Sequence, residues 1–198
     1  EVLKPLSRMA ELLTLVALAM GATCVIADLG QPLHGLLNLP RYARPSSPFF
    51  GTFSLVVGGY LFASSVYFFL AGRADAAACA ERGGPLRLFH RMWASGARGT
   101  PRERERHHTV SYWLSIFILP LLVTAHSTLG FIFGIQGGRP GWFNALQAPG
   151  FVVMAGVSGV GVLVLVAAGV RRGLRLESVI RPEAFRWLGN FMLVLTIV

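Results

Sequence analysis

The chain has 198 residues, of which 54% are hydrophobic and only 14% are charged, and its mean hydropathy is +0.58. This composition argues against a soluble globular domain and is typical of a membrane protein. The net charge of +9 does not indicate a nucleic-acid partner, because the basic residues lack the interleaved aromatic residues and the fold motifs of nucleic-acid binding.

Four apolar stretches, at residues 9–29, 50–71, 109–135 and 151–170, are each about 20 residues long, which is the length of helix that crosses a bilayer. A fifth run, 189–198, covers about half of that distance. We therefore predict an all-α, polytopic transmembrane helix bundle with four complete spans and a partial fifth. Residues 1–198 are expected to form a single membrane domain. The short fifth run and a first residue other than Met predict a fragment of a longer subunit.

The basic residues are distributed unequally between the two sides of the predicted bundle. Of the 18 lysines and arginines, all but Arg41, Arg44 and Arg139 fall on the side from which the chain enters the first span. The positive-inside rule assigns this arginine-rich side to the cytoplasm, and the other, arginine-poor side to the periplasm or the cell exterior. We predict a multi-pass protein of the bacterial inner membrane, with the PRERERHH run at 101–108 as a solvated cytoplasmic loop and a helical segment at 86–93 on the membrane surface.

Two loops on the arginine-poor side, at 30–50 and 134–150, are punctuated by glycine and proline. They predict structured segments along the outer interface, where the amphipathic ring of Trp142 suits the headgroup level. Within the spans, small residues four positions apart predict helix contacts at Gly59 with Ala63 and at Ala155 with Gly159.

Tyrosines aside, the ionisable residues well inside the spans are Asp28 and His126, both in the half of the membrane toward the arginine-poor side. Ionisable groups at such depth usually face a protein interior or a water-filled cavity, so these two are the functional candidates. Two structural alternatives stand beside this interpretation: Asp28 caps the segment that follows it, and His126 makes an interhelical hydrogen bond to a hydroxyl group. His34 either contributes from the loop or is a solvated loop residue.

Resident redox cofactors are not expected in this chain. The two cysteines, Cys24 and Cys79, are too few and too far apart in sequence for an iron–sulfur cluster or a cysteine zinc site. A haem held by two histidines is disfavoured because His107 and His108 lie about 27 Å of helix from His126. Redox chemistry would need a diffusible carrier or the cofactor of a neighbouring subunit.

Three segments resemble the NrfD-like, polysulfide-reductase-type membrane subunits, including the related subunits of alternative complex III. They are ADLGQPLHG at 27–35, SSPFFGTFSLVVGGYL at 46–61 and VTAHSTLGFIFGIQGGRPGWFNALQAPGFVVMAGVSG at 123–159. The resemblance implies a helical quinone oxidoreductase subunit of eight or more helices without a cofactor of its own. It also implies a quinone pocket toward the periplasm beside an iron–sulfur partner, with Asp28 and His126 among the polar residues of the pocket and proton path. Some relatives close to alternative complex III carry an acidic residue in the stretch that reads GFIFG at 130–134 in this chain. Here Ile132 or its neighbour replaces that acidic residue, which puts the proton route of those relatives in doubt for this chain.

The resulting hypothesis is an anchor subunit of a respiratory redox complex that binds a quinol, menaquinol above all, and exchanges electrons with a ferredoxin-like iron–sulfur subunit. Asp28 and His126 would handle the protons, and His34 and Trp142 would join them in binding the quinone. Arg41, Arg44 and Arg139 would dock the partner. The alternative is a structural or proton-conducting subunit that does not itself bind quinone. A secondary transporter would need discontinuous helices and an inverted repeat, and neither is evident.

Overall fold

The computed structural model describes residues 2–28, 30–42, 44, 46–47, 51, 54–95, 97 and 100–197, with the backbone alone for Tyr42 and Arg104. The predicted span ends at residues 29, 50 and 198 lie outside this part of the chain. The described residues contain no strand, and those outside the helices lie in turns, bends and irregular segments.

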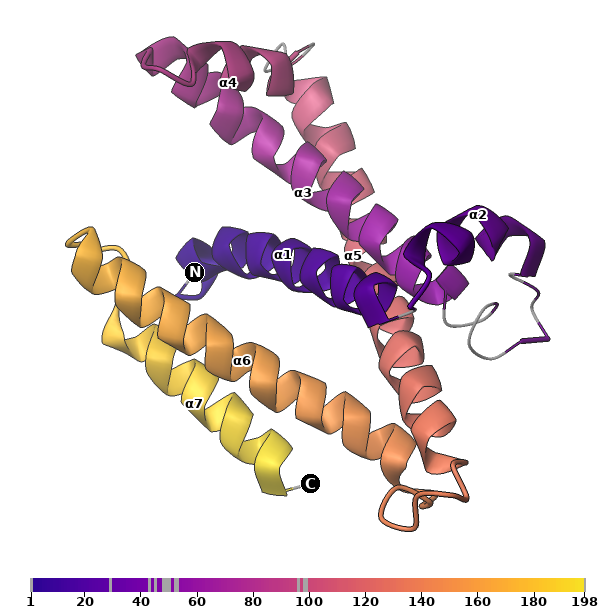
Figure 1. Ribbon diagram of the computed structural model, residues 1–198. Helices are drawn as coiled ribbons and strands as arrows, with labels where there is room; N and C mark the ends of the chain where they lie inside the picture. The colour runs from indigo at the N-terminus through magenta and orange to yellow at the C-terminus, as the bar shows by residue number, and fades with distance from the viewer. Residues whose placement is uncertain are drawn as a thin grey trace.

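Seven helices are described (Figure 1). They are α1 (Lys4–Asp28), α2 (Pro32–Tyr42), α3 (Ser54–Arg82), α4 (Arg87–Trp93), α5 (Pro101–Gly134), α6 (Gln147–Gly173) and α7 (Pro182–Ile197). Four of them, α1, α3, α5 and α6, are long and apolar enough to cross a membrane, which confirms the predicted all-α bundle of four spans. The partial fifth run belongs to α7, a helix of 16 residues that packs on α6.

The two central spans extend beyond their apolar segments on the arginine-rich side. Residues 101–108, predicted as a loop, form the first two turns of α5 and lengthen it by about 12 Å. The prediction was wrong because the segment carries helix-start chemistry. Thr100 caps the helix by accepting a hydrogen bond from the Glu103 amide at 3.3 Å, and Pro101 occupies the first turn, where its missing N–H costs nothing.

The short helix α4 occupies almost the predicted range and is attached to α3 through Trp93. The Trp93 indole N–H donates to the Phe69 carbonyl at 2.9 Å, and its ring lies 5.4 Å from that of Phe68. A side chain at Gly72 would collide with this indole, since a Cβ there would lie 2.6 Å from it. Large apolar side chains of the same segment remain exposed: Leu86, Leu88, Phe89 and Met92.

The spans are joined pairwise rather than around one central core (Figure 1). α5 packs between α3 and α6, whereas α1 contacts α3 and α6 but not α5. A buried cluster joins α1, α6 and α7 and consists of Leu6, Leu163, Ala167, Ile180, Ala184 and Leu188. Most other large apolar side chains are exposed, as expected for helices whose outer surfaces meet lipid or further helices.

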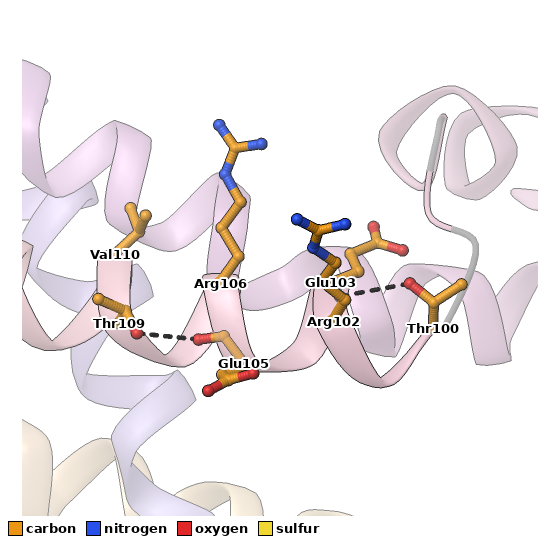
Figure 2. A pocket seen from close by; sticks show the side chains of 7 residues that line it. All are labelled: Thr100, Arg102, Glu103, Glu105, Arg106, Thr109 and Val110. Atoms are coloured by element: carbon orange, nitrogen blue, oxygen red, sulfur yellow. Dashed lines mark hydrogen bonds between the residues drawn. The ribbon is translucent and has the colours of Figure 1, made fainter.

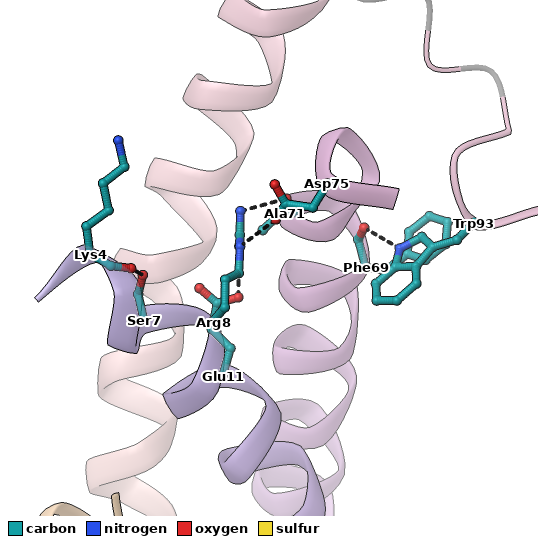
Figure 3. A network of polar contacts seen from close by, with 8 residues as sticks. All are labelled: Lys4, Ser7, Arg8, Glu11, Phe69, Ala71, Asp75 and Trp93. Carbon is teal, nitrogen blue, oxygen red and sulfur yellow. Dashed lines mark hydrogen bonds and ion pairs between the residues drawn. The ribbon is translucent and has the colours of Figure 1, made fainter. Parts of the chain in front are cut away.

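Arg8 connects α1 to α3 at the arginine-rich end (Figure 3). Its guanidinium is 3.1 Å from Asp75 and 2.9 Å from Glu11, and it donates to the Ala71 carbonyl at 2.7 Å. Because the Ala71 carbonyl belongs to the backbone of α3, this contact fixes the height of α1 along α3 as well as their separation.

The described residues show no helix contact at two of the four predicted small residues. A Cβ at Gly59 or Gly159 would meet nothing within 4 Å in the described structure, although Ala63 is buried. A close approach of two helix backbones is found instead at Gly130, where α5 meets α6. A spacing of four identifies a face on which helices can approach, but not the partner that uses it.

Candidate functional site

His126 lies in the interior of α5, half-buried and next to the buried Ala125. Its Nδ1 is 2.8 Å from the Leu122 carbonyl, one turn earlier in the same helix. A carbonyl only accepts hydrogen bonds, so Nδ1 carries a proton in this contact and Nε2 is the ring nitrogen that remains to accept one. Nε2 has no hydrogen-bond partner within the described residues. The predicted interhelical hydrogen bond to a hydroxyl group is thus replaced by a bond within α5.

The face of α5 that carries His126 also carries the contact with α6. His126, Gly130 and Phe133 are spaced by four and three residues and therefore share one side of the helix. A Cβ at Gly130 would lie 2.6 Å from both the Ala148 Cα and the Gln147 carbonyl oxygen. The lack of a side chain at this position lets the two backbones meet one turn beyond His126.

At the arginine-poor end of the same face, three aromatic residues and an arginine form a group, here called the Phe133 cluster: Phe133, Trp142, Phe151 and Arg139. The Phe133 ring lies 5.0 Å from Trp142, edge to face, and 5.5 Å from Phe151, nearly parallel. The Arg139 guanidinium stands over the Trp142 indole at 5.2 Å from its centroid. The cluster begins about 10 Å along the helix axis from His126. It offers flat apolar surfaces on the side of α5 that also carries the acceptor nitrogen.

The turns of the α5–α6 connection bring the members of the cluster together. The Trp142 amide donates to the Arg139 carbonyl at 2.8 Å, and the Leu146 amide donates to the Asn144 side chain at 2.8 Å. Two predicted residues, Arg139 and Trp142, are thereby placed in contact. Phe133 and Phe151 were not predicted from the sequence. Two sequence features could have indicated them: Phe133 lies at a helical spacing from His126, and Phe151 comes just after the loop.

Asp28 is the last residue of α1 and is exposed. The chain turns directly after it, where Gly30 has φ = 68°, and α2 begins at Pro32. Asp28 makes no hydrogen bond to α2 within the described residues, so the capping alternative is not seen there. Because α1 does not contact α5, the described residues do not bring Asp28 and His126 together.

The remaining predicted residues lie on α2 or just after it. His34 is exposed, and its carbonyl accepts a hydrogen bond from the Asn38 side chain at 2.9 Å. Arg41 is in the last turn of α2 and Arg44 follows it, both exposed. α2 contacts α1 alone among the described helices, so these three residues stand apart from the Phe133 cluster. One face of α2 presents exposed leucines: Leu33, Leu36 and Leu37.

The sequence matches known proteins along almost its whole length. Residues 1–196 match the family described as polysulphide reductase, NrfD. A protein of Halobacterium salinarum, named as a membrane subunit of a dimethyl sulfoxide reductase, is 32% identical over 163 residues, which are 81% of this chain and 34% of that protein. The chain therefore spans about a third of the length of the curated relative that it matches.

Proposed function

This chain belongs to the polysulphide reductase NrfD family, and from that membership we propose that it binds a quinol, with menaquinol as the expected species, near the arginine-poor face of a membrane reductase complex. The multi-pass helical architecture is that of a membrane subunit of such complexes. In the proposal the arginine-poor face is periplasmic, the membrane is a bacterial inner membrane, and a ferredoxin-like iron–sulfur subunit docks on that face.

The geometry of His126 is the observation that carries this proposal. Its Nδ1–H is committed to the Leu122 carbonyl at 2.8 Å, so Nε2 is the atom that can accept a proton. The Phe133 cluster on the same side of α5 supplies rings against which a flat quinone headgroup can lie. An acceptor nitrogen on the same side of a helix as apolar rings is the combination that an amphipathic redox carrier requires.

A quinol that becomes a quinone gives up two protons and two electrons. His126 accepts one proton at Nε2, and the second is assigned to Asp28, which requires the two residues to be brought together in the full subunit. The two electrons pass to the iron–sulfur subunit, and the same residues return protons when the reaction runs toward quinol.

The alternative, a structural or proton-conducting subunit that binds no quinone, is favoured by the position of Asp28. In the described residues this carboxylate is exposed at the end of α1, and α1 makes no contact with α5. A pocket built on Asp28 and His126 is therefore not formed by these contacts alone. Binding of a quinone distinguishes the two functions.

Photolabelling of the intact complex with an azidoquinone is expected to modify residues of the α5–α6 hairpin, because the Phe133 cluster and His126 lie there. Peptide mass spectrometry should find the adducts between 122 and 151, and an excess of menaquinol should remove them. Labelling confined to other subunits, or labelling that menaquinol does not compete, would leave the structural alternative as the better description.

Replacing Arg139 with glutamine is expected to weaken binding of the iron–sulfur subunit by about 3- to 10-fold, because a positive charge at the rim of an interface attracts an acidic partner. The measurement is the amount of this subunit retained by the membrane subunit across a salt series. Arg139→Lys keeps the charge and should retain most of the binding. Arg172→Gln, an exposed arginine on the opposite side of the membrane, is the matched control. Equal loss in Arg139→Gln and Arg172→Gln would contradict a docking role.

A further inference from the structure

Two cavities lie at the arginine-rich end of α5, away from the Phe133 cluster. The first, of about 440 Å³, is lined by Leu70, Arg73, Glu103, Arg106, His107 and Val110. The second, of about 630 Å³, is lined by Thr100, Arg102, Glu103, Glu105, Arg106, Thr109 and Val110 (Figure 2). Because both are lined by Glu103, Arg106 and Val110, they adjoin and are here called together the Arg106 cavity.

The acidic groups of the Arg106 cavity are partly offset. Glu103 is 3.7 Å from Arg73 of α3, so its charge is compensated across the helix interface. Arg73 also donates to the Ser95 carbonyl at 2.9 Å, and its other terminal nitrogen lies 3.3 Å from Nε2 of His107. An arginine only donates, so that His107 nitrogen is the acceptor in this contact.

The remaining charged residues of the lining are Arg102, Arg106 and Glu105, which together leave one net positive charge, carried by the two arginines. Their side chains extend from the same side of α5, one turn apart, whereas Glu105 extends from another side (Figure 2). Both arginines are exposed, and neither makes an ion pair within the described residues. Two guanidinium groups one turn apart form a suitable binding site for a phosphate group.

The same face of α5 continues from charge to hydrocarbon. Arg102, Arg106, Val110, Trp113 and Phe117 follow one another at three- to four-residue spacing. Trp113 is 63% exposed and Phe117 is 60% exposed, so this apolar part of the face is uncovered in the described structure. Tryptophan favours the headgroup level of a bilayer, which places the two arginines just outside it and Phe117 within the hydrocarbon.

We propose that the Arg106 cavity binds the headgroup of an anionic phospholipid from the leaflet on the arginine-rich side. Arg102 and Arg106 bind the phosphodiester, and an acyl chain lies along Val110, Trp113 and Phe117. Basic pockets beside transmembrane helices recognise lipid headgroups in this way. The apolar continuation favours a lipid over free phosphate, because free phosphate would leave Trp113 and Phe117 without an occupant.

The test uses the intact complex in phosphatidylcholine nanodiscs that contain a minor fraction of phosphatidylglycerol. Either the phosphatidylglycerol or the phosphatidylcholine carries brominated acyl chains. Bromine atoms quench tryptophan fluorescence on contact. We expect stronger quenching by brominated phosphatidylglycerol than by brominated phosphatidylcholine, and loss of the difference in Trp113→Phe. Equal quenching of the unmodified complex by the two lipids would overturn the proposal, and this result needs no arginine variant. The readout does not involve quinol turnover, so it is independent of the function proposed above.

Arginine variants assign the headgroup contact. Arg102→Gln with Arg106→Gln should lower the preference for phosphatidylglycerol by at least about fivefold, whereas Arg102→Lys with Arg106→Lys should keep most of it. Arg172→Gln with Arg186→Gln, two exposed arginines on the same side of the membrane, is the matched control. Added inorganic phosphate should not restore fluorescence. An unchanged preference in the double glutamine variant, or displacement by inorganic phosphate, would contradict a lipid site.

Discussion

Replacing His126 with alanine is expected to lower quinol-dependent turnover of the assembled complex by about 10²- to 10⁴-fold, the range that a positioned proton acceptor contributes. The ring supplies Nε2 as the acceptor because Nδ1–H is held by the Leu122 carbonyl at 2.8 Å. Alanine removes both atoms. Assembly should be intact, because within the part of the chain that the structure describes the half-buried imidazole bonds only to its own helix and joins no two elements. Turnover is measured with a soluble menaquinol analogue as the electron donor.

The matched control for this experiment is His108→Ala, because His108 lies on the same helix but is exposed on its arginine-rich extension. It should retain turnover close to that of the unmodified complex. Retention of the iron–sulfur subunit, checked by size-exclusion chromatography, excludes a loss of assembly in either variant. If assembled His126→Ala complex turned over within about threefold of the unmodified complex, the role of His126 as the proton acceptor would be refuted.

Gly130→Ala is expected to destabilise the subunit by about 1–3 kcal/mol, although alanine ordinarily stabilises a helix interior by about 0.5–1 kcal/mol relative to glycine. The added Cβ would lie 2.6 Å from the Ala148 Cα and from the Gln147 carbonyl oxygen. Both are backbone atoms, which cannot rotate away as the end of a side chain can, so α5 and α6 must separate. The apparent melting temperature of the full-length subunit in detergent should fall by several degrees. Quinol-dependent turnover should fall with it, because His126 and Phe133 lie on the displaced face.

Gly159→Ala provides the control, since it makes the same substitution in α6 where a Cβ would meet none of the described residues within 4 Å. Its melting temperature should be unchanged or slightly higher. The contrast between the two glycines isolates the helix contact from the general effect of the substitution on helix propensity. Similar melting temperatures for the two variants would show that the α5–α6 backbone contact does not limit stability.

The spans were predictable because the required information is local. A run of about 20 apolar residues specifies a crossing whatever its neighbours are. The polar extension of α5 was missed for a related reason: hydropathy identifies the part of a helix in the membrane, and 101–108 continues the helix outside it. Thr100 and Pro101 are a helix-start signal that could have been recognised in the sequence.

For the candidate site, the sequence predicted only how deep each residue lies in the membrane. Counting residues along a span gives the depth of Asp28 or His126, but not the side of the helix on which it lies or the helix that it faces. For His126 the face is now defined by Gly130 and Phe133, whereas Asp28 belongs to a helix that does not contact α5. The pairing of Phe133 with Phe151 likewise depends on how two helices cross, which single-sequence spacing does not specify. The shared pocket of Asp28 and His126 stays a prediction.

The backbone contact at Gly130 has a consequence for biogenesis. It joins residues that are close in sequence, as does the ring contact of Phe133 with Trp142. Contacts of this kind form early, while the ribosome is still synthesising the chain. α5 and α6 can therefore leave the translocon as one hairpin with the histidine and its neighbouring rings already arranged, before any later helix is made.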